Sequence, residues 1–335
     1  MNIRSFVIIV IGSLFCFSCR KSTPLIGFML PHTNIQRYII EKEEFTARCK
    51  QLGAAVLFKQ ANNDDRLQTQ HLDSLLNAGV AIIVLDPVNR FTAAEMVRKA
   101  HRAGVKVISY DRLISNIDVD AFLSFDPWMT GEQMTNAVIK LRPEGTYVIL
   151  GGDKSDLNAI GIDEGQQKVL KPYIESKKIN VGYKIFVDKW GYDDAFHEVN
   201  QYLNLAGKLP DAIVASSDLL AKGAIDALAK HQATGRVLVT GQGGELFACQ
   251  NIVKGNQLMT VYKPVKKLAD LAAELSIKMM NNDDVKGILT TTIHNGYGDI
   301  PSQLLVTIPV DSSNIRATIV ASGMVSEKDL YGASK

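Results

Sequence analysis

The sequence predicts an α/β protein with two doubly wound parallel-sheet lobes joined by a multi-crossing hinge. Its 335 residues are enough for two domains of ordinary size. Short, mostly apolar segments alternate with longer segments of helical periodicity, as expected for parallel strands covered by helices on both faces. This alternation runs through the chain twice, which indicates one sheet for each lobe.

The first run of alternating segments lies between residues 25 and 125. Apolar residues recur at helical spacing, and Gly79 and Gly104 stand where two of the helices should end. Asp86-Pro87 ends the third strand. The expected strands are Leu25–Leu30, Ala54–Phe58, Ala81–Leu85, Val105–Ser109 and Ala121–Phe125, and the expected helices are Ile35–Leu52, Leu67–Ala78 and Thr92–Ala103.

The second run occupies residues 147–262 and repeats the pattern. Its strands are again mostly apolar, so we expect a second sheet that is buried on both faces. The expected strands are Tyr147–Leu150, Tyr183–Val187, Ala212–Ala215, Val237–Thr240 and Leu258–Tyr262, and the expected helices are Gln166–Glu175, Asp194–Leu205, Leu219–Lys230 and Glu245–Val253.

The tail contains one long helix, Pro264–Met280, and two short strands near Ile288–Ile293 and Leu304–Ile308. Two strands are too few for a third domain, so we expect the tail to complete both sheets. Three crossings between the lobes would form a hinge beside a cleft. The predicted division gives residues 25–128 and 264–288 to an N-terminal lobe, and residues 129–263 and 289–330 to a C-terminal lobe.

The first residues form a leader of a different character. Arg4 precedes an apolar run, Phe6–Phe17, which is too short to span a bilayer and fits the hydrophobic part of a signal peptide. Ser18-Cys19 then resembles a bacterial lipoprotein signal. We interpret residues 1–19 as this signal, with Cys19 as the lipidated anchor of a periplasmic, membrane-attached protein. The alternative is ordinary cleavage, which would leave a soluble periplasmic protein.

Composition and motifs exclude several classes of function. The net charge is +2 without clustered Lys and Arg, which argues against a nucleic-acid partner. Outside the leader, Cys49 and Cys249 lie in helix-like segments, where we expect buried, unpaired thiols. The sequence lacks a Gly-x-Ser-x-Gly elbow and a His-Glu-x-x-His motif, and its six His have no metal-ligand spacing. We therefore expect no metal or cofactor and no catalysis. Paired carboxylates that cleave glycosides have no sequence signature, so an exported sugar-acting enzyme remains an alternative.

Polar residues follow the predicted strands at the positions where open α/β sheets bind ligands. Asp111 and Arg112 follow one strand, and such a pair can accept and donate hydrogen bonds to adjacent hydroxyls of a polyol. A salt-bridged loop is the alternative interpretation. Asp156 and Asn158 come after the next lobe's first strand. We expect these four residues to face the cleft.

Four further residues are candidates by position or rarity. Trp190 follows a strand among polar residues, and its indole face could pack against the C–H face of a sugar ring, although core packing is the usual role of a single Trp. Trp128 lies near a crossing, where we expect hinge packing. Asp218 is expected to cap the helix that follows it. Lys263 stands at another crossing.

Nine segments together resemble the D-xylose-binding branch of the ribose/galactose-type periplasmic sugar-binding family of bacterial ABC importers. The resemblance covers nearly all of the chain after the leader, and it implies a type I periplasmic binding protein: a monomer that closes on one monosaccharide, without catalysis, and delivers it to an ABC permease. The segments are Leu52-Gly53-Ala54, Ser109-Tyr110-Asp111-Arg112, Ser124-Phe125-Asp126, Gly151-Gly152, Lys168-Val169-Leu170-Lys171-Pro172-Tyr173, Val214-Ala215-Ser216, Thr240-Gly241-Gln242, Met259-Thr260-Val261-Tyr262-Lys263-Pro264 and Asn295-Gly296.

The resemblance also implies a set of ligand-binding residues. An Arg in the first helix, an Asp-Arg pair, an Asp and an Asn beside the sugar, a stacking Trp and a Lys at a crossing all have counterparts. A further family position, an Asn, is occupied here by Ser217. The implied residues are Arg37, Asp111, Arg112, Asp156, Asn158, Trp190, Ser217 and Lys263.

The chain departs from the family pattern at several positions around this set. Beside Ser217, the family's Asp after Gly-Gln is Gly243, the acidic residues after the first strand are Pro31-His32, and a Trp beside Arg37 is Tyr38. Each lost hydrogen bond is worth about 0.5–1.5 kcal/mol. Such losses can change the preferred sugar, whereas the resemblance implies a pentose, xylose or a similar sugar. The alternative recipient of the sugar-bound form is a membrane histidine kinase, which would make the protein a sensor.

Overall fold

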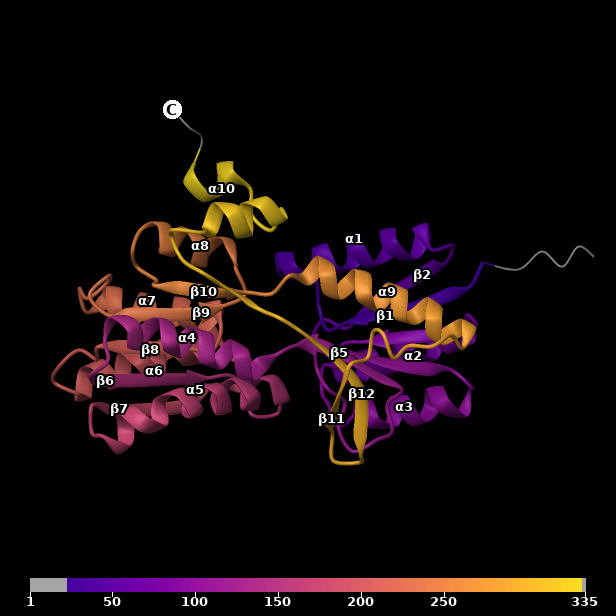
Figure 1. Ribbon diagram of the computed structural model, residues 1–335, viewed down its shortest axis with the longest axis horizontal. Coiled ribbons are helices and arrows are strands. Elements are labelled where there is room, and N and C mark those ends of the chain that lie inside the picture. The colour runs from indigo at the N-terminus through magenta and orange to yellow at the C-terminus, as the bar shows by residue number, and fades with distance from the viewer. Residues whose placement is uncertain (1–22, 333–335) are drawn as a thin grey trace, which may run out of the picture.

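The computed structural model describes residues 23–332, and it contains two α/β lobes that lie side by side (Figure 1). One is built on a seven-stranded sheet of order β11-β12-β5-β4-β3-β1-β2, and the other on a six-stranded sheet of order β13-β10-β9-β8-β6-β7. The leader and Cys19 lie outside the described residues. The predicted fold class is confirmed.

The N-terminal lobe places its helices on both faces of a sheet that is parallel apart from the β11–β12 pair. Helices α1 and α9 bury residues such as Phe45 and Leu268 on one face, and α2 and α3 bury Leu72 and Met96 on the other. Its elements are β1 (Leu25–Leu30), α1 (Gln36–Gln51), β2 (Ala55–Gln60), α2 (Asp65–Asn77), β3 (Ile82–Leu85), α3 (Ala93–Arg102), β4 (Lys106–Tyr110), β5 (Ala121–Phe125), α9 (Val265–Asn281), β11 (Thr291–His294) and β12 (Asp299–Leu305).

The C-terminal lobe repeats this layering. Helices α6 and α7 cover one face of its sheet, and α4 and α5 cover the other. Helices α8 and α10 pack together beside β10. The elements are α4 (Pro127–Leu141), β6 (Gly145–Gly151), α5 (Leu157–Glu175), β7 (Ile179–Phe186), α6 (Tyr192–Leu205), β8 (Ala212–Ala215), α7 (Asp218–Lys230), β9 (Leu238–Gln242), α8 (Leu246–Val253), β10 (Met259–Tyr262), β13 (Ile308–Val310), a π-helical turn (Arg316–Val320) and α10 (Glu327–Tyr331).

Helix α4 was not predicted, although the chain signals its start clearly. Pro127 is its first residue, and the Asp126 side chain caps it by accepting a 2.9 Å hydrogen bond from the Met129 amide. The helix packs closely on α5 because both helices carry glycine at the contact. An added Cβ at Gly131 would lie 2.0 Å from the Ile162 backbone oxygen, and one at Gly165 would lie 2.1 Å from a backbone oxygen of α4.

The residues after α9 are shared between the two lobes differently from the expectation. Strands β11 and β12 complete the N-terminal sheet, whereas the sequence assigned residues 289–330 to the C-terminal lobe. Strand β12 pairs in parallel with β5, with Ser302 opposite Phe122, and it buries Ile300. The chain then crosses at Val306-Thr307 and adds β13 antiparallel to β10. The single strand expected near Leu304–Ile308 is therefore two strands in two sheets.

Three crossings join the lobes, after β5, after β10 and after β12 (Figure 1). The last is tied to the first, because the Gln133 amide of α4 donates a 3.0 Å hydrogen bond to the Thr307 carbonyl. Strand β5 is parallel to β4, strand β10 is parallel to β9, and each reaches a crossing at its carboxyl end. The carboxyl ends of both sheets therefore meet at the hinge, where the candidate residues were expected.

Two further findings concern the described residues. Cys49 and Cys249 are both buried and unpaired, as expected. No helix between residues 23 and 332 combines the length and apolarity that a membrane span requires.

Candidate ligand-binding site

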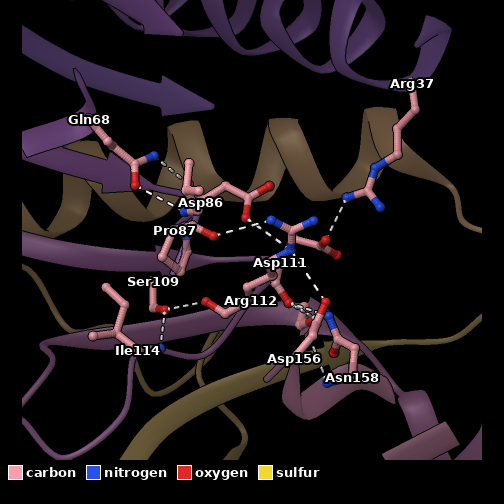
Figure 2. Close-up of polar contacts among 12 residues, drawn as sticks. Arg37, Gln68, Asp86, Pro87, Ser109, Asp111, Arg112, Ile114, Asp156 and Asn158 are labelled. Carbon is pink, nitrogen blue, oxygen red and sulfur yellow. Dashed lines mark hydrogen bonds and ion pairs between the residues drawn. The ribbon is translucent and has the colours of Figure 1, made fainter. Parts of the chain in front are cut away.

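A buried cluster of charged side chains lies between the two sheets (Figure 2). Its centre is Asp111, which follows β4. One carboxylate oxygen lies 3.0 Å from Nη2 of Arg37 in α1, and the other lies 3.6 Å from Nζ of Lys263 at the second crossing. Three elements that are far apart in the sequence thus meet at one carboxylate.

The backbone of Asp111 is held in an unusual conformation. Its φ of 58° lies in the left-handed region, which non-glycine residues rarely adopt. The backbone amide donates to the Leu123 carbonyl at 2.8 Å, while the Asp111 carbonyl accepts from Ser124 Oγ at 2.7 Å and from Asn158 Nδ2 at 3.0 Å. Neighbouring strands thus fix a strained residue, and such strain is characteristic of ligand-binding positions.

Arg112 connects the two lobes across the cleft. Its Nε lies 3.4 Å from Oδ2 of Asp156, which caps helix α5 of the opposite lobe. The same nitrogen lies 3.9 Å from Oδ1 of Asp86, and Nη1 donates to the Pro87 carbonyl at 3.2 Å. In Figure 2 the guanidinium lies between these acceptors. Because it is only 23% exposed, its charge interacts with them in a medium of low polarity.

Two carboxylates of the cluster were missed by the sequence analysis. Asp86 follows β3 and is completely buried, so the rule that ligands bind after strands could have found it. Glu41 lies one helical turn after Arg37 and accepts a 3.0 Å hydrogen bond from its Nε. Glu41 could have been found from its position four residues after Arg37, which the family resemblance had already indicated as a ligand-binding residue.

The charges in the cluster shift one another's pKa values. Burial alone would raise the pKa of Asp111, but Arg37, Lys263 and Arg112 together hold it well below its usual range. Burial raises the pKa of Asp86 well above its usual range and that of Glu41 to about 7. Burial also lowers the pKa of Lys263, against the attraction of Asp111. Perturbed groups of this kind gather at functional sites.

Several buried oxygens of the cluster have no hydrogen-bond partner within residues 23–332. They include both carboxylate oxygens of Asp86, Oδ1 of Asp111 and the Tyr110 hydroxyl. Unpartnered buried polar groups are rare and costly. Carboxylates that can accept, beside Arg and Lys groups that can donate, match the paired hydroxyls of a polyol. No cluster of His, Cys, Asp or Glu suited to a metal ion occurs in this part of the chain.

Trp190 and Ser217 lie outside this hydrogen-bonded cluster. Trp190 has a φ of 56° and lies over Gly152, where an added Cβ would be 2.3 Å from its indole ring. Ser217, and not Asp218, caps α7, since its Oγ accepts from the Leu220 amide at 3.2 Å. Asp218 is the first helical residue, and its carboxylate turns inward to the loop after β9. The expected cap was therefore displaced by one residue.

His32 follows β1, and Tyr38 lies beside Arg37 in α1. The ring of His32 meets the edge of Tyr38 at 4.8 Å between centroids, and the Arg37 guanidinium lies 5.1 Å from the Tyr38 ring centre. Burial lowers the pKa of His32, and the charges of Arg112 and Arg37 lower it further. An imidazole and a phenol thus stand where the family resemblance implied acidic residues and an indole.

Two α/β lobes with a polar site between them are typical of periplasmic binding proteins, and the comparison with known proteins agrees with this class. The periplasmic binding protein domain family matches residues 26–284, so the chain belongs to that family. The chain is 34% identical to the D-xylose-binding periplasmic protein of Haemophilus influenzae, over 99% of this chain and all of the relative. It is 36% identical to the protein of that name from Escherichia coli, over 91% of this chain and 92% of the relative.

A solved structure has the same architecture. The solute-binding protein of an ABC transporter from Clostridium phytofermentans, with bound β-D-glucose, superposes with a TM-score of 0.84. The match covers 91% of this chain and 99% of that chain, at 25% identity.

Proposed function

We propose that this protein binds one monosaccharide, xylose or a closely similar pentose, between its lobes and delivers it to an ABC importer. The observation that carries the proposal is the buried cluster around Asp111, in which several acceptors lack partners and the charged side chains come from both lobes. A ring with adjacent hydroxyls can satisfy both kinds of group at once. The D-xylose-binding relatives support the choice of sugar.

The binding residues fall into two groups in this proposal. Arg37, Asp111 and Lys263 hold one edge of the sugar, and Arg112 and Asp156 bridge the lobes beside it. The remaining predicted contacts are Asn158, Trp190 and Ser217. Asn158 already donates one N–H to the Asp111 carbonyl, so its amide oxygen and its second N–H remain for hydroxyls.

Binding would be coupled to closure of the hinge. A ligand shifts a conformational equilibrium only by its preference for one state. The cluster contains Arg112 from one lobe and Asp156 from the other, so a sugar that contacts both is held better when the lobes are close. Attachment to the membrane through Cys19 would keep the receptor near its permease. In this proposal the receptor acts as a monomer and leaves the sugar chemically unchanged.

A thermal-shift screen tests this proposal. A ligand that binds only the folded protein raises Tm, so xylose or a similar pentose is expected to raise it and glycerol is not. Sugar released from the complex should be recovered unchanged in mass and retention time. The proposal fails if no monosaccharide raises Tm, and recovery of an altered sugar would favour an enzyme.

A further inference from the structure

Asp86 and Asp111 leave neighbouring strands at the same edge of the N-terminal sheet. Strand β3 is parallel to β4, with Leu85 opposite Ser109. Asp86 follows β3 directly, as Asp111 follows β4. Because the carboxyl ends of parallel strands meet at one edge, both acids lie where open α/β sheets bind their ligands.

The backbone around Asp86 is fixed by buried hydrogen bonds. Its amide donates to the Met29 carbonyl at 2.9 Å, and its carbonyl accepts from Nε2 of Gln68 at 2.9 Å. Oε1 of the completely buried Gln68 accepts from the Val88 amide at 2.9 Å, so this side chain bridges the turn (Figure 2). These bonds hold the backbone of Asp86 and leave its carboxyl group free.

The carboxyl group of Asp86 has no hydrogen bond of its own. It is completely buried, and neither oxygen has a hydrogen-bond partner within residues 23–332. Nε of Arg112 lies 3.9 Å from Oδ1, beyond hydrogen-bond distance, and this guanidinium donates instead to the Pro87 carbonyl. A buried carboxyl group without a partner lowers stability, and groups kept at such a cost are typical of binding sites.

We propose that the carboxyl group of Asp86 forms a hydrogen bond with one hydroxyl of the bound monosaccharide, next to Arg112. The inference rests on the proposed function and adds a specificity-determining residue to it. A buried site that hydrogen-bonds a hydroxyl rejects sugars without that hydroxyl, because its own polar group is then left unpaired. Asp86 thus selects the configuration at one ring carbon, in addition to the contacts made by Asp111.

Titration calorimetry of the wild type and of the Asp86→Leu, Asp86→Asn and Asp118→Asn variants tests the proposal. The probes are xylose, ribose, arabinose and glucose, followed by the monodeoxy analogues of the sugar that binds. Asp86→Leu, similar in size but without polar atoms, should weaken binding by about tenfold or more. Asp86→Asn should weaken it less, since an amide still forms hydrogen bonds. Asp118→Asn, at an exposed acid of the same lobe, should bind like the wild type.

The deoxy analogues distinguish a direct contact from an effect of Asp86 on Arg112 alone. For the analogue that lacks the contacted hydroxyl, wild type and Asp86→Leu should agree within about twofold, while the other analogues keep the difference. An equal loss for every analogue would overturn the inference, as would unchanged affinity of Asp86→Leu for the parent sugar. Both results leave the proposed function intact, whereas a wild type that binds none of the sugars would overturn the two together.

Thermal melting without sugar gives a second readout. Removing a buried carboxyl group that has no partner should leave the Tm of Asp86→Asn unchanged or higher, although the variant binds sugar less well. A Tm lowered by several degrees in both Asp86 variants would show that the carboxyl group stabilises the fold, and would overturn the inference.

Discussion

At the scale of single residues, burial and neighbouring cations shift the pKa values of the carboxyl groups in the cluster in opposite directions. Arg37 and Lys263 lower the pKa of Asp111, while burial raises the pKa values of Asp86 and Glu41. Isolated buried charges are too costly to survive, so the cations fix which acids ionise. The result is a site with fixed donors and acceptors, which a neutral polyol can bind without any change of net charge.

The Arg112→Lys variant tests whether the guanidinium fork matters beyond its charge. Lysine keeps the positive charge but loses the planar donors that reach Asp156 and the Pro87 carbonyl. We expect sugar affinity to fall about ten- to a hundredfold, the loss of one charge-assisted hydrogen bond of about 1.5–3 kcal/mol. Titration calorimetry measures it, with Arg98→Lys on the exposed face of α3 as the matched control. Equal affinities in both variants would contradict this role.

The raised pKa of Glu41 predicts a pH-dependent stability. Its pKa of about 7 in the folded protein lies above the ordinary 4.5, so folding favours the protonated form. This contribution to stability is complete below pH 4.5 and is lost as pH rises through 7. It is worth up to about 3 kcal/mol, since one pKa unit is about 1.4 kcal/mol.

Urea unfolding at pH 5 and pH 8 measures this effect in the wild type and in Glu41→Gln. The free energy of unfolding of the wild type should fall more over this interval than that of the variant. The lowered pKa of Asp111 acts only below its ordinary 3.8, outside the interval, and Glu245, whose pKa burial raises to about 7, contributes to both proteins alike. Parallel pH profiles would show that Glu41 is already charged at pH 5.

At the scale of elements, the contact of α4 with α5 depends on glycine. Gly165→Ala would force a Cβ to within 2.1 Å of the Trp128 backbone oxygen. We expect a loss of about 1–3 kcal/mol from overpacking and a Tm lower by several degrees. Gly287→Ala is the control, because an added Cβ there meets nothing within 4 Å. Calorimetric melting of both variants gives the comparison, and equal Tm values would refute the packing argument.

The elements also show what sequence patterns can and cannot predict. Most strands were placed within a few residues, because continuous apolar runs between helices have few alternative structures. Helix α4 was missed because its buried face contains Thr130, Gly131 and Thr135 in place of large apolar residues. The division of the tail was wrong for β11 and β12, because local periodicity does not reveal which sheet a strand joins.

The residues of the site, too, could be predicted from the sequence only in part. Asp111, Arg112, Asp156 and Asn158 could be chosen from their positions after strands, and the structure brings them together. Asp86 obeys the same rule but ends a strand with a proline, which we interpreted as a stop signal alone.

At the scale of the whole molecule, three crossings let two rigid lobes move about one hinge. Three of the four cores lie within a single lobe, whereas the core under α1 and α9 continues into the C-terminal lobe at residues such as Cys249 and Ile319. We expect the radius of gyration in solution scattering to fall when the binding sugar is added at saturation. A radius unchanged by a sugar that demonstrably binds would argue against closure.

The central claim is that the buried cluster binds one pentose. Isothermal titration of the protein without its leader, against xylose, ribose, arabinose, glucose, galactose and fructose, tests it most directly. The account predicts one-to-one binding of xylose or a similar pentose with a Kd in the micromolar range or tighter. The absence of binding to all six sugars would contradict it and leave the cluster without a sugar ligand.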